Sequence, residues 1–201
     1  MEHIRVITIS RQLGSLGWEI ASATASNLGF QFYWREVLNK AAQRSSSPEA
    51  ALAAIDELGL LGICPSPKIC LAYRQAIEQV MFELANIGNV VILGRAGQAV
   101  LRNRRDALHI RLVSSIQTRA ERISCRHNIS LESALAQIEA SDRYRRNYLK
   151  RHYQVCWDDP TLYDLTISTE RLSIESAVAI ISQAAGNTQE LPETTHQAPQ
   201  E

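Results

Sequence analysis

The sequence lacks a long apolar run and lacks an excess of charge of either sign. No apolar stretch approaches the roughly 18 residues that a membrane-spanning helix needs, so no such helix is predicted. Lys and Arg together number 21, as do Asp and Glu, so no global basic field exists to attract nucleic acid or an anionic membrane. The opening stretch MEHIRVITIS has no long apolar segment, which predicts that a signal peptide is absent.

Cysteine is scarce, and its spacing excludes the common metal-binding patterns. Cys64, Cys70, Cys125 and Cys156 form no CxxC pair, and the five histidines show no metal-ligand spacing either. No metal site made of protein ligands is therefore predicted. Scattered free thiols in a chain of 201 residues fit a reducing compartment, so a cytoplasmic location is expected.

Short apolar stretches alternate with longer stretches of helical periodicity. Strands are expected at residues 4–9, 90–93, 107–113 and 163–169, with a possible short strand within FQFYW at 30–34. Helices are expected at residues 18–28, 69–87, 115–126, 130–151 and 173–185, with Ser130 as an N-cap. Strands that are apolar throughout and alternate with helices are typical of a parallel sheet with both faces covered. We therefore predict an α/β fold with a five-stranded parallel sheet and helices on both faces.

Residues 1–185 are expected to form one domain. A Ser- and Pro-bounded excursion at 45–67 holds one short helix and is a candidate inserted subdomain or lid. From residue 186 the chain turns polar, so residues 186–201 are expected to be a disordered tail.

The stretch ITISRQLGSLGWEIA, residues 7–21, runs from an apolar strand through a glycine-containing loop into a helix. Gly14, Ser15 and Gly17 are small enough to let a phosphate approach, and the helix that follows supplies its positive end. The usual phosphate-loop signature G-x-x-x-x-G-K-[ST] is incomplete, because no lysine follows a glycine and no Ser or Thr follows to hold Mg²⁺. An ordinary strand-to-helix turn, a decayed site and a site that works in another way all stay open from the loop alone.

Two further stretches carry charges that allow more than one interpretation. Five basic residues lie between Asp142 and Arg151, and helical spacing puts Arg143, Arg146 and Lys150 on one face, which is either a binding surface or a solvated face. Near the last strand, Asp158 and Asp159 either order water around Mg²⁺ or cap a turn before Pro160.

The order and spacing of several stretches resemble the cytidylate-kinase-like proteins, a branch of the nucleoside monophosphate kinases. The resemblance covers residues 4 to 185. It rests on ITISRQLGS, FYWRE, VILGR, DALHIRLVSSIQTRAERI, DRYRRNY and WDDPTLYDLTISTERLSIESAV. It implies a P-loop kinase fold, with a monophosphate-binding insertion at about 34–70 and a lid at about 140–160.

The resemblance also implies a reaction and the residues for it. The reaction is phosphoryl transfer from ATP, with Mg²⁺, to a pyrimidine nucleoside monophosphate, CMP or dCMP being favoured; the acceptor base and the oligomeric state stay open. In such chemistry charge neutralisation and positioning do most of the work. By resemblance, Arg95 and Arg35 bind the acceptor, and the lid arginines Arg143 and Arg145 close over the transferring group. The loop residues that line the ATP phosphates are Gly14, Ser15, Leu16, Gly17 and Trp18.

The chain departs from the family pattern at several of these positions. The branch itself lacks the loop lysine, and in register with ordinary cytidylate kinases Gly17 takes its place, with Arg11 as a candidate substitute charge. Leu16 stands where the branch has glycine, which adds bulk near the phosphates and disfavours a positive φ. Trp18 stands where the branch has arginine, and Trp34 where it has aspartate. Ala96-Gly97 follows Gly-Arg in place of the commoner Gly-Ala.

Two functions are consistent with these departures. One is an active nucleoside monophosphate kinase; the other is a degenerate relative that binds a nucleotide or a protein and regulates. An exposed Trp18 beside a loop still shaped to hold an anion favours the regulator. A Trp18 packed under a helix favours the kinase.

Overall fold

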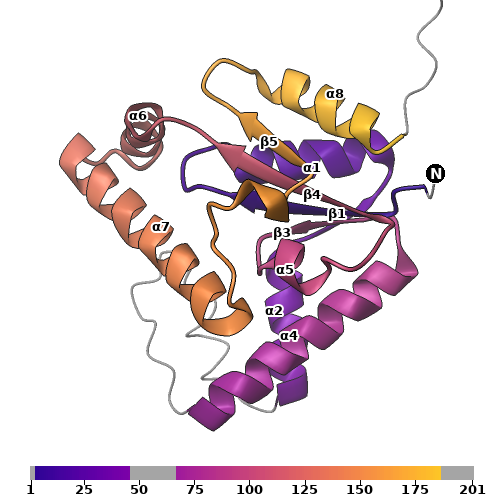
Figure 1. The fold of residues 1–201 in the computed structure, drawn as a ribbon. Coiled ribbons are helices and arrows are strands. Elements are labelled where there is room, and N and C mark those ends of the chain that lie inside the picture. Colours follow the sequence, from indigo (N-terminus) through magenta and orange to yellow (C-terminus); the bar gives the residue numbers. More distant parts are fainter. Residues whose placement is uncertain (1–2, 46–66, 187–201) are drawn as a thin grey trace, which may run out of the picture.

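A five-stranded, fully parallel sheet forms the centre of the molecule in the computed structural model, which describes residues 3–45 and 67–186 (Figure 1). Its strands are β1 (Val6–Arg11), β2 (Gln31–Tyr33), β3 (Val90–Leu93), β4 (Ala107–Val113) and β5 (Leu165–Ser168). They lie side by side in the order β2-β3-β1-β4-β5. The predicted five-stranded parallel sheet is confirmed.

Helices cover both faces of the sheet, as predicted (Figure 1). One face carries α1 (Gly17–Leu28) and α8 (Ile174–Ala184), which contact each other. The other face carries α2 (Arg35–Ser45), α4 (Pro67–Ile87) and the single turn α5 (Gly97–Val100). The helices α6 (Ile116–His127) and α7 (Leu131–Tyr153) pack on each other, and α7 passes the carboxyl ends of the strands before the short 3-10 helix η1 (Pro160–Leu162).

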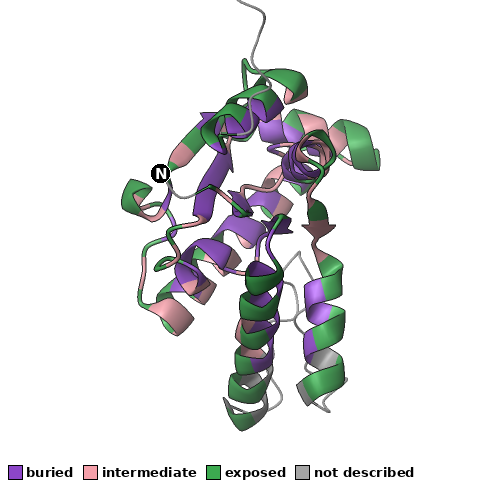
Figure 2. Cartoon of the chain, turned by 90° about the vertical axis from the view of Figure 1, so that its right-hand side faces the viewer, coloured by how far each residue is buried: buried purple, intermediate pink, exposed green. Residues whose placement is uncertain are grey.

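The alternation of side chains along β1 separates two apolar cores. Val6 belongs to a cluster with residues of α2 and α4, whereas Ile7 and Ile9 belong to a cluster with residues of α1 and α8. Successive side chains of a strand point to opposite faces, so a strand that is buried at five successive positions, as β1 is, must be covered on both faces. Figure 2 shows the resulting buried layer running through the sheet and the inner faces of its helices.

Most predicted elements begin and end within two residues of the observed bounds. Ser130 caps α7, because its Oγ accepts a hydrogen bond of 3.1 Å from the N–H of Ser133. The loop begins later than expected: β1 continues through Ser10 to Arg11, since both residues stay in register with β4. The helix expected within 45–67 and the expected tail lie, apart from their edges, outside the described residues.

Among residues 3–45 and 67–186, no helix combines the length and the apolar character that crossing a membrane requires.

Candidate functional site

The loop between β1 and α1 has the shape of an anion-binding turn. Gly14 has a φ of +84°, and a Cβ there would lie 2.9 Å from the backbone oxygen of Arg119, so only glycine fits. Ser15 is buried and donates a hydrogen bond of 2.8 Å from its Oγ to the carbonyl of Gln12. Because α1 begins at Gly17, the N–H groups of its first turn have no carbonyl partners within the helix. The loop therefore presents the donors and the helix end that phosphate groups need.

Leu16 keeps the backbone conformation of a glycine. It caps α1 with a φ of +59° and a ψ of 29°, a conformation that costs a non-glycine residue roughly 1–2 kcal/mol. Its side chain packs against the apolar core that includes Ile7 and Ile20. Leu16 thus adopts a positive φ although it is not glycine. Its side chain, which was expected to add bulk near the phosphates, packs against the core instead.

Two arginines of α6 brace this loop from outside. Arg122 donates from Nη1 to the carbonyl of Gly14 at 3.2 Å, and from Nη2 to the carbonyl of Thr169 at 2.6 Å. Arg119 donates to the carbonyl of Leu13 at 3.5 Å. The sequence assigned neither residue a role, although their i, i+3 spacing, which puts both on one helix face, was visible.

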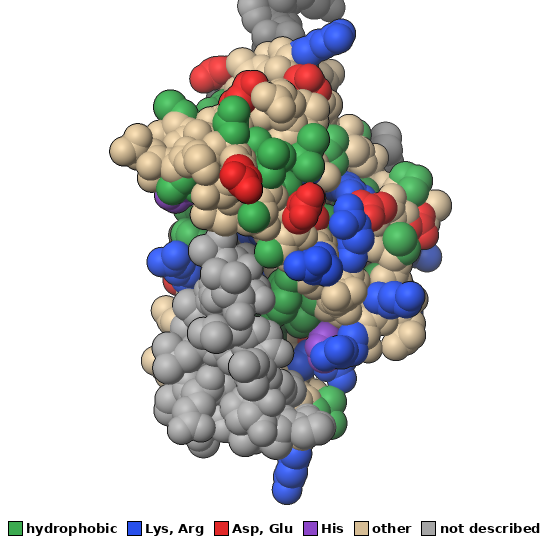
Figure 3. Space-filling view, turned by 90° about the vertical axis from the view of Figure 1, so that its left-hand side faces the viewer, with side chains coloured by type: hydrophobic (Ala, Val, Ile, Leu, Met, Phe, Trp, Pro, Cys, Tyr) green, Lys and Arg blue, Asp and Glu red, His purple; other side chains and the backbone are tan. Residues whose placement is uncertain are grey.

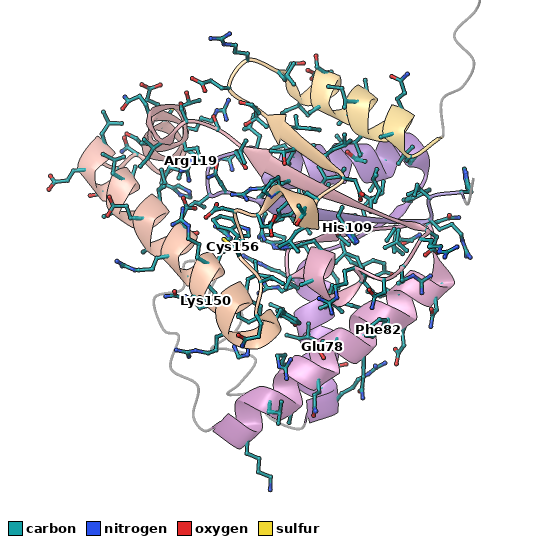
Figure 4. The ribbon with its side chains drawn as sticks, in the orientation of Figure 1. Glu78, Phe82, His109, Arg119, Lys150 and Cys156 are labelled. Carbon is teal, nitrogen blue, oxygen red and sulfur yellow. The ribbon has the colours of Figure 1, made fainter. Side chains whose placement is uncertain are left out.

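Arg119 also forms a buried ion pair with Asp142 of α7. The Nη1 to Oδ2 distance is 3.0 Å, and both side chains are at least nine-tenths buried. Figure 4 shows Arg119 between α6, α7 and the sheet. A charge pair that is this deeply buried fixes α7 against α6 at one geometry, because each charge needs the other.

A cavity of about 440 Å³ lies between the beginning of the loop and these two helices. It is lined by Gln12, Ile116, Arg119, Ile138, Glu139, Asp142, Arg143, Arg146 and Asn147. The structure thus places Arg143 and the loop residue Gln12 on the wall of the same cavity. Arg145 is not among the lining residues, and its Nη1 donates to Ser141 Oγ of the same helix at 2.5 Å.

Arg146 belongs to a cluster that fastens the end of α7 to the sheet. Asp158 accepts from Arg146 Nε at 2.8 Å and from Arg111 Nη2 of β4 at 2.5 Å. The Arg111 guanidinium lies 4.9 Å from the ring of Trp157, whose indole N–H donates to Ser10 Oγ at 2.9 Å. Both arginines hold the pKa of Asp158 below its usual range, although burial opposes them.

Arg95 and Ala96 form a strained turn at the carboxyl end of β3. Their φ angles are +57° and +58°, directly after Gly94 at +82°. Arg95 faces α7 closely enough that its charge opposes the increase that burial causes in the pKa of Tyr148. Ala96 is buried in a cluster with Trp157 and residues of α7. Alanine therefore replaces the family's glycine here without changing the left-handed backbone, as Leu16 does in the loop.

The remaining predicted residues lie on either side of the loop. The Arg11 side chain passes over Gly17 and reaches Gly94. Trp18 is 49% exposed, and its ring meets Phe32 edge-on at 6.3 Å. Trp18 is therefore exposed and not packed under a helix, and an exposed Trp18 beside this loop favours the regulator.

Arg35 lies at the start of α2, beyond the end of β2. Its guanidinium stacks on the ring of Trp34 at 4.5 Å. Neither Arg35, Trp34 nor Trp18 lines the 440 Å³ cavity. These residues therefore do not share that cavity with Arg143.

Acidic residues of the described ranges do not assemble a metal site. No group of three or more His, Cys, Asp or Glu side chains in residues 3–45 and 67–186 is placed to hold an ion. Asp159 caps η1 by accepting from the N–H of Thr161 at 2.9 Å, so it is the turn cap of the two alternatives. Asp158 is engaged by two arginines instead.

The face that carries α6 and α7 mixes charges of both signs. Figure 3 shows Lys and Arg side chains gathered on this face with acidic side chains among and above them. The visible part of this face therefore carries no patch of a single sign of charge.

Comparison with known sequences points to one family. The profile described as the cytidylate kinase-like family matches residues 6–171. The cytidylate kinase of Pyrococcus abyssi is 32% identical over 179 residues, which cover 89% of this chain and 92% of that protein. The cytidylate kinase of Methanocaldococcus jannaschii is 34% identical over 115 residues, and the match covers 56% of this chain and 65% of that protein. The chain thus spans less than two thirds of some curated relatives that it matches.

Solved structures with the same fold are more distant in sequence. An uncharacterized protein from Eubacterium ventriosum superposes with a TM-score of 0.73 at 18% identity, covering 92% of this chain and 99% of that one. Shikimate kinase from Bacteroides thetaiotaomicron gives 0.54 at 14% identity, with 90% and 98% covered. A gluconokinase from Sinorhizobium meliloti gives 0.56 at 17% identity, with 93% and 97% covered. The fold is that of the P-loop kinases.

Proposed function

The chain belongs to the cytidylate kinase-like family, and we propose that it is a nucleoside monophosphate kinase with CMP or dCMP as the favoured acceptor. The observation that carries the kinase over the regulator is the match to cytidylate kinases over most of the chain. The loop between β1 and α1 supports phosphate binding, which both candidates share. It keeps its left-handed turn even though Leu16 replaces glycine, and arginines from α6 hold it there. A turn that had lost its ligand would have no need to retain a backbone conformation that costs free energy.

The reaction that we propose is an in-line phosphoryl transfer. A phosphate oxygen of the monophosphate attacks the γ-phosphorus of ATP, the bond from that phosphorus to the β–γ bridging oxygen breaks, and ADP leaves with the electron pair. The products are ADP and a nucleoside diphosphate. Little covalent chemistry is left for the protein, so its residues act by positioning and by neutralising charge.

The residues divide into a donor side and an acceptor side. On the donor side, the loop from Gly14 to Trp18 would hold the phosphates of ATP with its N–H groups. On the acceptor side, Arg95 and Arg35 would bind the monophosphate, since a guanidinium fork matches two phosphate oxygens. Arg143 lines the cavity beside the loop and, with Arg145 on the same helix, would act as the lid that covers the transferring group.

Membership of a kinase family implies Mg²⁺, but the described residues offer no ligand set for it. Trp18 and Glu19 follow Gly17, and Glu19 is ion-paired with Arg126. We therefore assign the ion no protein ligand. When bound with ATP it would neutralise phosphate charge.

A coupled assay with ATP, Mg²⁺ and each nucleoside monophosphate in turn tests the proposal directly. ADP release with CMP or dCMP, at a rate above that with AMP, GMP and UMP, is the expected result. In parallel, calorimetry should show that Arg95→Ala binds CMP about 10- to 100-fold more weakly than wild type, the loss of one charge-assisted contact. Equal CMP affinity in the variant would remove Arg95 from the acceptor site.

A regulatory protein that binds a nucleotide without turnover is the second candidate. The half-exposed Trp18 next to the loop favours it. The two candidates separate in one comparison: wild type against the double variant Leu16→Gly, Trp18→Arg. Phosphoryl transfer by the double variant, with none by wild type for any monophosphate, would identify a decayed loop and support the regulator.

A further inference from the structure

The side chain of Arg11 crosses the carboxyl edge of the sheet instead of continuing along β1. A Cβ built on Gly17 would lie 2.8 Å from the Cβ of Arg11 and closer still to its Cγ. A Cβ built on Gly94 would lie 3.2 Å from the Cζ of Arg11 and closer still to Nη1. The aliphatic part of the Arg11 side chain therefore passes directly over Gly17, the first residue of α1. Its guanidinium ends beside Gly94, the residue that follows β3.

The crowding at Gly17 involves the near end of the arginine. Cβ of Arg11 is fixed by the strand, because the backbone of Arg11 is paired with Leu112 of β4. Cγ and the atoms beyond it turn with the side-chain torsions, but Cβ cannot swing away from a new side chain. Any side chain at position 17 must therefore displace Arg11 or the start of the helix.

This position is the one from which a phosphate loop normally extends its lysine. The lysine stands at the beginning of the helix and reaches the β- and γ-phosphates. Here the helix begins at Gly17, and the space that a lysine would enter holds the stem of Arg11. Arg11 and a lysine at position 17 thus compete for the same space, and either one would bring a single positive charge to this edge of the sheet.

We propose that Arg11 supplies from the end of β1 the charge that binds the ATP phosphates, and that Gly17 and Gly94 are glycines because its side chain needs their space. The proposal rests on the proposed function and names the residue that makes a site without the lysine workable. The guanidinium lies beside Gly94, the residue before Arg95. Its planar fork can bond two phosphate oxygens at once, which suits it to a phosphate group bound at this edge.

The opposite end of β1 provides a control for the change of charge. A Cβ on Gly88 would lie 2.6 Å from Nε and 2.7 Å from Cζ of Arg5, so here the far end of an arginine covers a glycine. Arg5 donates to the carbonyl of Ile87 at 2.9 Å, at the edge of the sheet away from the loop. Because Gly88 has a φ of +78°, a lysine there strains the backbone as well, and no phosphate group is expected nearby.

The test is a relocation of the charge. Four proteins are compared: wild type, Arg11→Ala, Gly17→Lys and the double variant Arg11→Ala, Gly17→Lys. Thermal unfolding reports the steric conflict, and calorimetry with ATP reports the charge. The same cycle with Arg5→Ala and Gly88→Lys is the control.

We expect Gly17→Lys alone to unfold at a lower temperature than wild type. Arg11→Ala removes Cγ and the atoms beyond it but keeps Cβ, so it should restore part of that loss in the double variant. Arg11→Ala should bind ATP about 10- to 100-fold more weakly, as loss of a charged hydrogen bond does. In the double variant, the logarithm of the Kd for ATP should return at least halfway to the wild-type value. The Arg5 and Gly88 cycle should change stability without changing ATP affinity. A merely structural Arg11 would not be replaced in binding by a lysine on another element.

Three outcomes would overturn the proposal. They are a wild type that does not bind ATP, a Gly17→Lys variant as stable as wild type, or a double variant that binds ATP no better than Arg11→Ala. Failure of the proposed function looks different. ATP binding would then depend on Arg11 as stated, while no monophosphate receives a phosphoryl group from wild type.

Discussion

The turns at both edges of the sheet contain positive φ angles, but these angles fall on different residue types at each edge. At the amino edge, the turn into β3 has positive φ angles at Gly88 and Asn89 (+78° and +54°). At the carboxyl edge, positive φ angles fall on Leu16, Arg95 and Ala96 as well as on glycines. Glycine adopts this conformation freely and asparagine tolerates it, whereas the others lose roughly 1–2 kcal/mol each.

The difference shows where the molecule holds strain. In parallel sheets ligands bind beyond the carboxyl ends of the strands. Strained residues persist only where the surrounding contacts determine the backbone, and they gather at functional sites. Here Arg122 holds the loop next to Leu16, and a core cluster holds Ala96. The amino edge needs no such contacts, because its turn uses residue types that accept the conformation.

The largest expected effect is on turnover, which should depend on arginines at the carboxyl edge of the sheet and not on one at the amino edge. Arg143→Ala should lower turnover with CMP by about 10³-fold or more, as removal of a positioned arginine does in phosphoryl transfer. Arg145→Ala should act in the same direction, and Arg146→Ala less, because Asp158 engages it. Arg104→Ala at the amino edge should leave turnover unchanged. Equal losses for Arg143→Ala and Arg104→Ala in steady-state assays would contradict the comparison.

The next effect separates the edges by stability. Arg119→Ala leaves the Asp142 carboxylate buried without its partner and should lower the free energy of unfolding by about 3–5 kcal/mol. The ion pair of Arg104 with Asp106 is about one-fifth exposed, so Arg104→Ala should cost only about 1 kcal/mol. Urea denaturation measures both values. A loss as small for Arg119→Ala as for Arg104→Ala would show that Asp142 finds another partner.

The pH dependence of stability tests the region between the edges. His109 is buried in β4 and shares a hydrogen bond of 2.7 Å with Thr8 of β1. Burial lowers its pKa in the folded protein, while Asp164 opposes this. The unfolded state then takes up the proton more readily, so the free energy of unfolding should be constant above about pH 6.5 and fall as the pH drops below it.

The control for this prediction is His109→Gln, which keeps a polar partner for Thr8 but does not titrate. Burial lowers the pKa of His152 as well, so the variant should reduce the slope between about pH 6.5 and 5 without abolishing it. Denaturation curves across this range give the slope. An unchanged slope in the variant would exclude His109 as its source.

The smallest effect tests the strain itself. Ala96→Gly removes a β-carbon from a left-handed position, which should raise the free energy of unfolding by up to about 1 kcal/mol after the larger entropy of the unfolded glycine is counted. Asn89→Gly at the amino edge should change it by only a few tenths of a kcal/mol. Denaturation midpoints measure both. A loss of stability in Ala96→Gly would mean that the packing of its methyl group outweighs the strain.

The sequence predicted the sheet well because the strands carry their own signal. Residues 90–93 are a continuous apolar run, residues 107–113 are apolar except for His109 and Arg111, and the structure places β3 and β4 at those bounds. The loop was visible for a similar reason, since Gly14 and Gly17 lie close together in the sequence. Arg119 and Asp142 were not assigned roles, because their pairing joins residues 23 positions apart on two helices. Periodicity places such residues on helix faces but does not say which faces meet.

The central position of β1 has a consequence for the making of the protein. Val6 pairs with Val90 on one side and with Ala107 on the other, so both neighbours of this strand are synthesised long after it. At about 5–20 residues per second, a ribosome needs several seconds to supply them. The loop can adopt its final packing only later, because Gly14 packs against the backbone of Arg119, which is synthesised after both of these strands. A nascent chain that stops before α6 therefore contains the whole sequence of the loop without the α6 contacts that give the loop its shape.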